Sequence, residues 1–380
     1  MKSLRSFLGT LVVALLTAGC SLEGDYPQSS VAPASDFAEL IHGLYVDIFW
    51  WTLLILVVVW VVLLYILIRF RARPDSPTPK QIHGHMGLEI AWTIVPAIIV
   101  VAITIPTIQA VFSTQQTNVE GAMVVDVIGH QYWWEFRYPD TGLITANEVH
   151  IPVDRPVSFR LSSADVIHSF WVPMLGGKRD ANPVRIRPDG VDPRYSWIHL
   201  TPNETGTFWG QCAEFCGSSH SLMGFRVVVE SDEDFAAWQG ALATPVVAPD
   251  AVAAAGDQEP QDTTAAQGQD PQVVATVDPL VEQGRTLFHQ QTCVACHAIE
   301  GTNAQGEIAP NLTLLGRRTS IAAGMMENTL ENLEAWIKAP QDIKPGALMP
   351  GVAVPGGNWP ATNLTDEQVS AIAAYLYSLR

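Results

Sequence analysis

The stretch GQCAEFCGSSHSLMGF, residues 210–225, places two cysteines, a histidine and a methionine close together in a chain that has only five cysteines. Cys212 and Cys216 are four residues apart, His220 follows four residues later, and Met223 three after that. Thiolate and thioether sulfurs are soft ligands that suit copper, whereas structural zinc is bound by Cys and His and does not use Met. The spacing favours a copper site. A disulfide between the two cysteines, or the Cys-x3-Cys motif of a copper-delivery protein, remains an alternative.

The sequence on both sides of this loop predicts β-structure. From about 122 to 230, short runs of alternating and β-branched residues are separated by turn residues, which is typical of an antiparallel β-sandwich or barrel. His168, in ADVIHSFWVP, also follows a predicted strand, so it could reach the cysteines from a loop at the same end of the barrel. Two bridging thiolates, one histidine on each copper and weak outer ligands would suit rapid electron transfer.

The N-terminal third is strongly apolar. Residues 1–20 have a basic start, an apolar run and a small-residue exit that resembles a bacterial lipobox, which predicts lipidation of Cys20; an ordinary signal peptide is the alternative. Two runs, about 45–68 and 90–112, are each long enough to cross a bilayer core of about 30 Å as a helix. Four Lys and Arg residues (Arg69, Arg71, Arg73 and Lys80) lie between these runs, whereas residues 21–43 contain no Lys or Arg. The connecting loop is therefore expected in the cytoplasm and both flanks outside.

The rest of the chain is acidic and contains a second cofactor motif. The formal net charge of -17 argues against nucleic acid as a partner. Residues 241–276 have no aromatic and no basic residue and predict a flexible linker. Beyond it, Cys293-Val-Ala-Cys296-His297 is the attachment signature of c-type haem, in which two thioether bonds hold the porphyrin and the histidine binds iron. No histidine follows His297, and Met349, in KPGALMPG, is the expected sixth ligand; Met325 and Met326 are expected to be packing residues at a helix start.

Together these motifs resemble cytochrome c oxidase subunit II, which carries the dinuclear copper centre CuA. The resemblance covers about residues 40–240 and includes three further segments: Glu89-Ile-Ala-Trp-Thr-Ile-Val-Pro96, Gly129-His-Gln-Tyr-Trp-Trp134 and Asp165-Val-Ile-His-Ser169. Residues 278–380 resemble a class I cytochrome c, in which Pro310 matches the residue whose carbonyl holds the haem-ligating histidine.

The resemblance implies a role for each matching residue. The expected CuA ligands are His168, Cys212, Glu214 (through its carbonyl), Cys216, His220 and Met223. The Glu214 side chain is expected to help bind magnesium shared with subunit I, and Glu89 to stand at the mouth of a proton channel; a solvated helix-start carboxylate is the alternative for Glu89. Tyr132 occupies a position where many family members have an electron-accepting Trp, and Trp133 or Trp134 could serve instead.

The sequence thus predicts a multidomain membrane protein with a two-helix transmembrane hairpin, a cupredoxin-like β-barrel or sandwich, and an all-α cytochrome c domain. The expected order is a lipoprotein-type signal peptide (1–19), an extracytoplasmic N-terminal segment (20–43), the hairpin (44–113), the CuA domain (114–240), the linker (241–276) and the cytochrome c domain (277–380).

The resemblance implies a subunit of a proton-pumping haem–copper oxidase of the bacterial cytoplasmic membrane, with both redox domains on the periplasmic face. Electrons would enter at haem c, pass to CuA and reduce oxygen in subunit I. Expected partners are subunits I and III and a donor, either a cytochrome c or a quinol–cytochrome c reductase complex. A CuA-containing nitric oxide reductase subunit is the main alternative. A quinol oxidase subunit, which lacks copper ligands, and a membrane-tethered copper carrier or electron shuttle fit the motifs less well.

Overall fold

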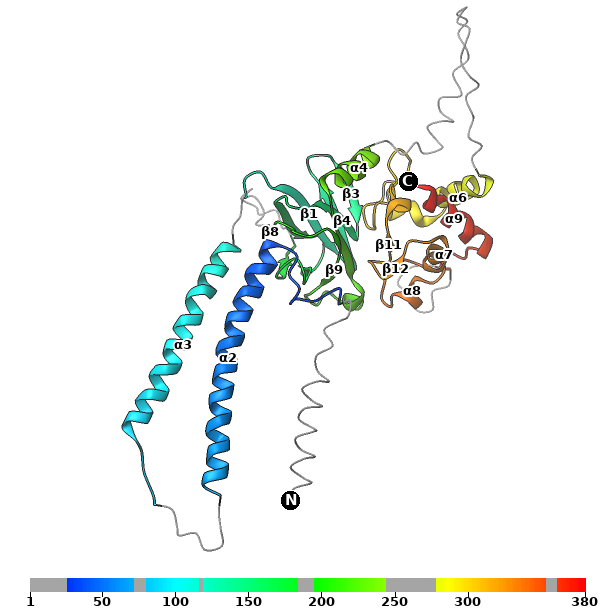
Figure 1. Cartoon of the computed structure of the whole chain (residues 1–380). Helices are drawn as coiled ribbons and strands as arrows, with labels where there is room; N and C mark the ends of the chain where they lie inside the picture. Colours follow the sequence, from blue (N-terminus) through cyan, green and yellow to red (C-terminus); the bar gives the residue numbers. More distant parts are fainter. Residues whose placement is uncertain (1–25, 72–79, 116–118, 184–194, 244–277, 353–360) are drawn as a thin grey trace, which may run out of the picture.

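The computed structural model describes residues 26–71, 80–115, 119–183, 195–243, 278–352 and 361–380. Two long helices lead into a β-domain, and a mainly helical domain lies against the side of the β-domain (Figure 1). The signal peptide with Cys20 and nearly all of the predicted linker lie outside the described residues. The expected order of a two-helix hairpin, a β-sandwich domain and a C-terminal, mainly helical domain is confirmed.

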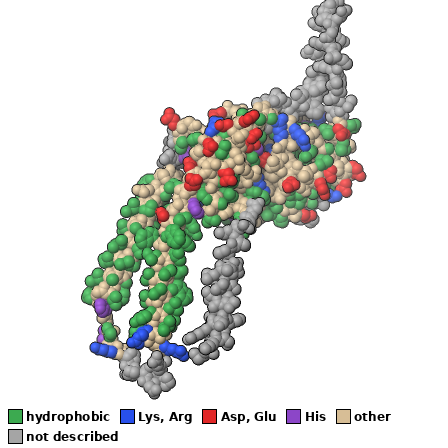
Figure 2. All heavy atoms as spheres, in the orientation of Figure 1, with side chains coloured by type: hydrophobic (Ala, Val, Ile, Leu, Met, Phe, Trp, Pro, Cys, Tyr) green, Lys and Arg blue, Asp and Glu red, His purple; other side chains and the backbone are tan. Residues whose placement is uncertain are grey.

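The two long helices are α2 (Asp36–Arg69) and α3 (Met86–Ser113). Both extend beyond the apolar runs at 45–68 and 90–112, because polar first turns and caps continue the helices outside the hydrophobic segments. Ser35 caps α2 by accepting a hydrogen bond from the Ala38 N–H. Their length and mean hydropathy, 3.0 and 2.3, are sufficient for membrane crossing. Hydrophobic side chains cover both helices, and Lys and Arg side chains gather at their far end (Figure 2).

The first turn of α2 is attached to the β-domain rather than projecting freely from it. The Ser35 hydroxyl donates to the Leu175 carbonyl at 2.7 Å, and the Asp36 carboxylate accepts from the Thr201 N–H at 2.7 Å. Phe37 packs over Gly176, where a Cβ would lie 2.3 Å from the Phe37 ring. These contacts fix the β-domain at the end of the helices opposite the basic loop.

The β-domain is a sandwich of two five-stranded sheets. One sheet has the order β3 (Leu143–Ala146), β2 (Trp133–Tyr138), β1 (Met123–His130), β5 (Val157–Ser163) and β8 (Ser196–Leu200). The other has the order β4 (Glu148–Pro152), β10 (Gly224–Glu230), β9 (Gly206–Cys212), β6 (His168–Trp171) and β7 (Arg179–Ala181). The expectation of a purely antiparallel sandwich is wrong, because β1–β5 and β4–β10 pair in parallel. Alternation within a strand predicts its buried face but not the direction of its neighbour.

An aromatic core holds the two sheets together. Trp134, Phe136, Phe159, Phe170 and Phe225 are at most 2% exposed, and Phe170 stacks on Phe225 with ring centroids 4.5 Å apart. Gly210 of β9 admits this packing, since a Cβ there would lie 2.1 Å from the Phe225 ring. The core thereby fixes β9 and β6, the strands that border the cysteine loop. Helix α4 (Asp232–Ala243), which was not anticipated, follows β10.

The C-terminal domain is built on α6 (Pro279–Gln290) and α9 (Asp366–Ser378), with α7 (Leu330–Lys338) and α8 (Pro340–Ile343) beside them. The close approach of α6 and α9 requires Gly284, where a Cβ would lie 1.8 Å from the Ala371 carbonyl oxygen. Short 3-10 turns lie at Thr292–Ala295 (η2) and Leu315–Arg317 (η3). The expected helix start at Met325 and Met326 is wrong: Met326 lies in β12 (Met326–Glu327), which pairs with β11 (Ser320–Ile321).

Candidate copper and haem centres

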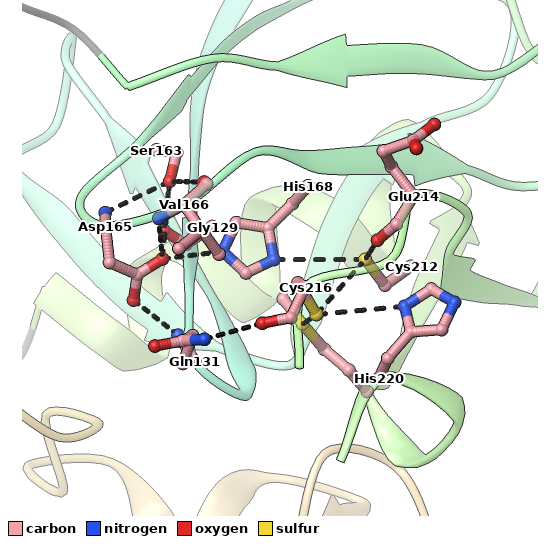
Figure 3. Close-up of polar contacts among 11 residues, drawn as sticks. Gly129, Gln131, Ser163, Asp165, Val166, His168, Cys212, Glu214, Cys216 and His220 are labelled. Carbon is pink, nitrogen blue, oxygen red and sulfur yellow. Dashed lines mark hydrogen bonds and ion pairs between the residues drawn. The ribbon is translucent and has the colours of Figure 1, made fainter. Parts of the chain in front are cut away.

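Sulfur and imidazole groups converge at one end of the β-sandwich (Figure 3). His168 comes from the start of β6 rather than from the predicted loop, and the other groups come from the end of β9 and the loop that follows it. The Cys212 and Cys216 Sγ atoms are 3.9 Å apart, His168 Nδ1 lies 3.8 Å from Cys212 Sγ, and His220 Nδ1 lies 3.7 Å from Cys216 Sγ. The Met223 Sδ atom lies 3.8 Å from Cys216 Sγ, and the Glu214 carbonyl oxygen 3.2 Å from Cys212 Sγ. The six predicted ligands are therefore neighbours.

Strand pairing explains this convergence. Cys212 is the last residue of β9 and His168 the first of β6, and these strands pair with Phe170 opposite Cys212. The loop then turns back through the 3-10 turn η1 (His220–Leu222) into β10, which places Met223 beside the sulfurs. Cys212, Cys216, Met223 and His168 are at most 5% exposed, so these four side chains are shielded from bulk solvent, whereas His220 is half-buried.

The donor set fits metal better than a disulfide. A disulfide needs sulfur atoms about 2.05 Å apart, whereas Cys212 and Cys216 are free and their sulfurs lie 3.9 Å apart. With metal–sulfur bonds of about 2.3 Å, one ion can contact both sulfurs at this separation. The hydrogen bond with the Cys216 thiol and that with His168 lower the pKa of Cys212 despite its burial. The site thus favours a thiolate, the form that binds metal.

Asp165 orients His168. Its Oδ1 atom is 2.8 Å from His168 Nε2, which leaves Nδ1 facing Cys212. Burial opposes the charged imidazole, but the hydrogen bonds to Asp165 and Cys212 raise the pKa of His168. Gly129 provides the space for the ring, because a Cβ there would lie 2.6 Å from His168 Cδ2. A carboxylate behind a histidine ligand is a common way to fix its orientation.

Sequence reasoning missed Gln131 as a residue of this site. The Gln131 N–H donates to Asp165 Oδ2 at 2.6 Å, and its side-chain amide donates to the Cys216 carbonyl at 2.5 Å. It therefore ties the loop that orients His168 to the loop that carries the cysteines. The Gly-His-Gln segment was recognised as a landmark, but this contact spans 85 residues of chain and has no local signal.

The three aromatic residues predicted for electron entry have different environments. Tyr132 is 9% exposed, and its hydroxyl accepts a hydrogen bond from the Ser218 N–H at 3.1 Å. Trp133 stacks on His130 with ring centroids 4.1 Å apart. Trp134 is fully buried in the aromatic core, in edge contact with His168 at a centroid distance of 5.7 Å. Tyr132 is therefore the aromatic residue that directly contacts the cysteine loop.

The Glu214 side chain points away from the sulfurs in Figure 3, and its carboxylate lies 3.7 Å from Lys178 Nζ. A cavity of about 590 Å³ lies between the cysteine loop and the first turns of α2, and it is lined in part by Ile41, Lys178 and His220.

Glu89 lies in the first turn of α3, where its carboxylate accepts a hydrogen bond from the His85 N–H at 3.0 Å.

The C-terminal domain presents a haem-attachment geometry. Cys293 and Cys296 are free and partly exposed, and His297 Nδ1 lies 2.8 Å from the Pro310 carbonyl oxygen. Since that bond occupies Nδ1, Nε2 is left for iron. Burial lowers the pKa of His297, which keeps the imidazole neutral, as an iron ligand must be. Cys293 and Met349 both pack at the edge of the domain's hydrophobic core, so the residues fit a covalently held haem.

Family models match three successive parts of the chain. The transmembrane domain of cytochrome c oxidase subunit II matches residues 27–110, its periplasmic domain residues 142–231, and cytochrome c residues 281–380. The matches have the same order as the hairpin, sandwich and helical domain.

Curated relatives extend this result to the whole chain. Cytochrome c oxidase subunit 2 of Alkalihalophilus pseudofirmus is 34% identical over 100% of this chain and 98% of the relative, and that of Bacillus subtilis is 33% identical over 100% and 99%. Quinol oxidase subunit 2 of Bacillus spizizenii is 34% identical but covers 62% of this chain. The periplasmic domain of subunit II of the Bradyrhizobium japonicum oxidase is a solved structure with 28% identity, covering 33% of this chain and 95% of that domain at a TM-score of 0.29. The chain belongs to the cytochrome c oxidase subunit II family and ends in a cytochrome c domain.

Proposed function

We propose that this chain is the electron-entry subunit of a proton-pumping haem–copper oxidase. Haem c would accept electrons and the dinuclear copper centre would deliver them to subunit I, where oxygen is reduced to water. The observation that carries the proposal is the convergence of two thiols, two imidazoles and a thioether on one site, in a chain that also has a haem-attachment motif.

The chain's own residues would hold the copper centre and limit its rearrangement. Cys212 and Cys216 would bridge the metal ions, His168 and His220 would bind one ion each, and Met223 and the Glu214 carbonyl would be weak outer ligands. Asp165, Gln131 and the aromatic core restrict these donors, so their positions change little when charge changes.

In the second domain, Cys293 and Cys296 would form the thioether bonds, and His297 and Met349 would be the axial ligands. A His/Met ligand pair favours a relatively high potential. The Pro310 carbonyl, at 2.8 Å, fixes the ring orientation of His297.

The membrane arrangement suggests the remaining assignments. The hairpin would pack on subunit I in the bacterial cytoplasmic membrane, both redox domains would lie on the periplasmic face, and subunit III would complete the complex. The Glu214 carboxylate, exposed and directed away from the sulfurs, would bind magnesium with subunit I. Glu89, at the start of α3, would serve a proton channel, and Cys20 would be lipidated.

The proposal is tested by metal analysis of the full chain, produced without the other oxidase subunits and loaded with copper and haem. Two coppers per haem c iron, with an electron paramagnetic resonance signal in which one electron is shared by both coppers, is the expected result. Iron without copper, together with a Cys212–Cys216 disulfide in peptide mapping, would refute the copper assignment. Cys216→Ser should remove the shared-electron signal while the haem c absorbance remains.

A further inference from the structure

The haem domain packs against the copper domain through a set of polar contacts, called the seat below. Four residues of the copper domain form hydrogen bonds with the haem domain: Glu148 contacts Thr319, Arg226 contacts Gly324, Tyr132 contacts Lys344, and Ser219 contacts Pro345. Glu148, Arg226 and Lys344 are all charged side chains and are 2%, 7% and 4% exposed. Burying charges is unfavourable unless partners are well placed, so such an interface favours one orientation over others.

Glu148 is the most deeply buried of these charged residues. One oxygen of its carboxylate accepts from the Thr319 N–H at 3.0 Å and from the Thr319 hydroxyl, and the other lies 3.2 Å from His150 Nε2. Burial opposes its charge, but these hydrogen bonds to His150 and Thr319 keep the pKa of Glu148 below its ordinary value. The carboxylate therefore connects the two domains as an anion.

Arg226 forms the second contact. Its guanidinium lies 3.3 Å from the centre of the Trp209 ring and donates to the Gly324 carbonyl of the haem domain. Two glycines allow this approach: a Cβ at Gly324, where φ is +77°, would lie 2.8 Å from the guanidinium, and one at Gly224 would lie 3.1 Å from the Ala323 carbonyl oxygen. An extra carbon at either glycine would crowd the opposite surface, so the two domains are in close contact here.

The third contact places the segment preceding Met349 on the copper loop. Lys344 Nζ donates to the Tyr132 carbonyl at 2.6 Å, and the Ser219 hydroxyl donates to the Pro345 carbonyl. At Gly346, a Cβ would lie 2.4 Å from Ser218 Oγ. Ser218 and Ser219 stand between Cys216 and His220, so the two cofactor loops are in direct contact.

We propose that Glu148 is a positioning residue for electron transfer: with Arg226 and Lys344 it holds the haem domain so that the Met349 loop stays against Tyr132 and the copper loop. This inference rests on the proposed function. A tether alone would raise the local concentration of the haem domain but leave many orientations open. The seat selects one of them, in which Lys344 Nζ donates to the Tyr132 carbonyl.

Glu230 supplies a matched control for Glu148. Its carboxylate lies 3.2 Å from the other nitrogen of His150. Glu148→Ala and Glu230→Ala therefore each remove one carboxylate from the same imidazole, and only Glu148 has a recorded hydrogen bond to the haem domain. Glu148→Gln keeps an oxygen that can accept from Thr319 and should restore the seat in part.

The test uses the full chain in its oxidase complex, loaded with copper and haem, and two measurements. The first is acylation of Lys344 by an amine-reactive ester, read by mass spectrometry against exposed Lys338. The second is the rate at which copper is reduced after flash reduction of haem c. In Glu148→Ala, loss of hydrogen bonds to a buried charge should raise Lys344 labelling at least about tenfold and slow the transfer. Combining it with Arg226→Ala should strengthen both effects.

Each outcome has a distinct meaning. Unchanged labelling and transfer in the double variant would overturn the proposal. Equal effects in Glu230→Ala and Glu148→Ala would also overturn it, because the change would then act through His150 inside the copper domain. Absence of transfer in the parent complex, with Lys344 still protected, would refute the proposed function but leave the seat intact.

Discussion

The imidazole of His168 is held by a carboxylate that is not itself a candidate ligand. Asp165 accepts hydrogen bonds from the Val166 and Gln131 N–H groups, each at 2.6 Å, and faces His168 Nε2. Burial opposes its ionisation, but these bonds keep the pKa of Asp165 low. The negative charge remains in place at neutral pH and directs His168 Nδ1 towards Cys212.

Replacing Asp165 with Ala should weaken copper binding by about 10–100-fold, the usual effect of removing a partner that orients a histidine ligand. The measurement is competitive copper titration of the full chain against a chelator of known affinity. Asp126→Ala is the control, since Asp126 pairs with Arg160 on the same domain and has no recorded contact with the described ligand residues. Equal affinities for the Asp165 variant and the parent would show that the scaffold alone orients His168.

The ligand types were predictable because Cys, Met and His side chains can be recognised as metal-binding groups from the sequence alone. Cys212, Cys216, His220 and Met223 lie within one loop, and this spacing is visible without a structure. Gln131 was not predictable, because its role depends on a contact with the Cys216 carbonyl across the sandwich. An amide side chain also has many common structural roles, so its identity alone gives no signal.

Helix packing in the haem domain depends on a single position without a side chain. Gly284 lies where α6 crosses α9, and its Cα faces the Ala371 carbonyl and the Tyr375 side chain. These two helices frame the core against which Cys293 and Met349 pack. Any change in their separation should therefore be transmitted to the haem site.

Gly284→Ala should destabilise the haem domain by about 1–3 kcal/mol, because the added carbon overpacks a rigid backbone contact. Denaturant unfolding of the full chain, followed by haem absorbance, measures the change in midpoint. Gln283→Ala is the control, since it alters the neighbouring, exposed position of the same helix. An unchanged midpoint for Gly284→Ala would mean that the helices separate at no measurable cost.

At the level of elements, the sequence pattern predicted the two long helices and a β-rich domain, but it missed α4, and the ends and pairing of the elements followed from other contacts. Helix α2 begins at Asp36 because Ser35 caps it and the β-domain holds its first turn. The parallel pairing of β1 with β5 joins strands that are separated in the chain by β2, β3 and β4, and β4 belongs to the other sheet. Such pairings depend on chain topology, which alternation within one strand does not encode.

The relation between the two redox domains belongs to the whole molecule and had no sequence signal. Glu148, Arg226 and Lys344 are charged residues that, by type alone, are expected at the surface. In the assembled chain each is buried and takes part in a hydrogen bond between the domains. The sequence predicted that a haem domain and a copper domain share one chain, but not which faces of the two are in contact.

Lys344 should make the seat of the haem domain pH-dependent. Burial lowers the pKa of Lys344 to about 7, whereas a solvated lysine has a pKa of about 10.4. The seated state therefore binds fewer protons than the released state between about pH 7 and pH 10.4. Consequently the free energy that holds the haem domain on the seat becomes more favourable as pH rises through this window, and the gain is lost as pH falls. Below about pH 7 Lys344 is protonated in both states, so its titration no longer changes the stability of the seat.

Hydrogen exchange of the Thr319 amide measures this dependence, because that N–H donates to Glu148 across the interface. After correction for the intrinsic exchange rate, protection at Thr319 should rise between pH 7 and pH 9 by at most about tenfold per pH unit. Lys344→Met should remove the rise, while Lys338→Met, which alters an exposed lysine paired with Asp366, should retain it. If Thr319 protection still rises with pH in Lys344→Met, the pH dependence belongs to another group. If protection in the parent does not change with pH, the seated Lys344 keeps its proton throughout this range.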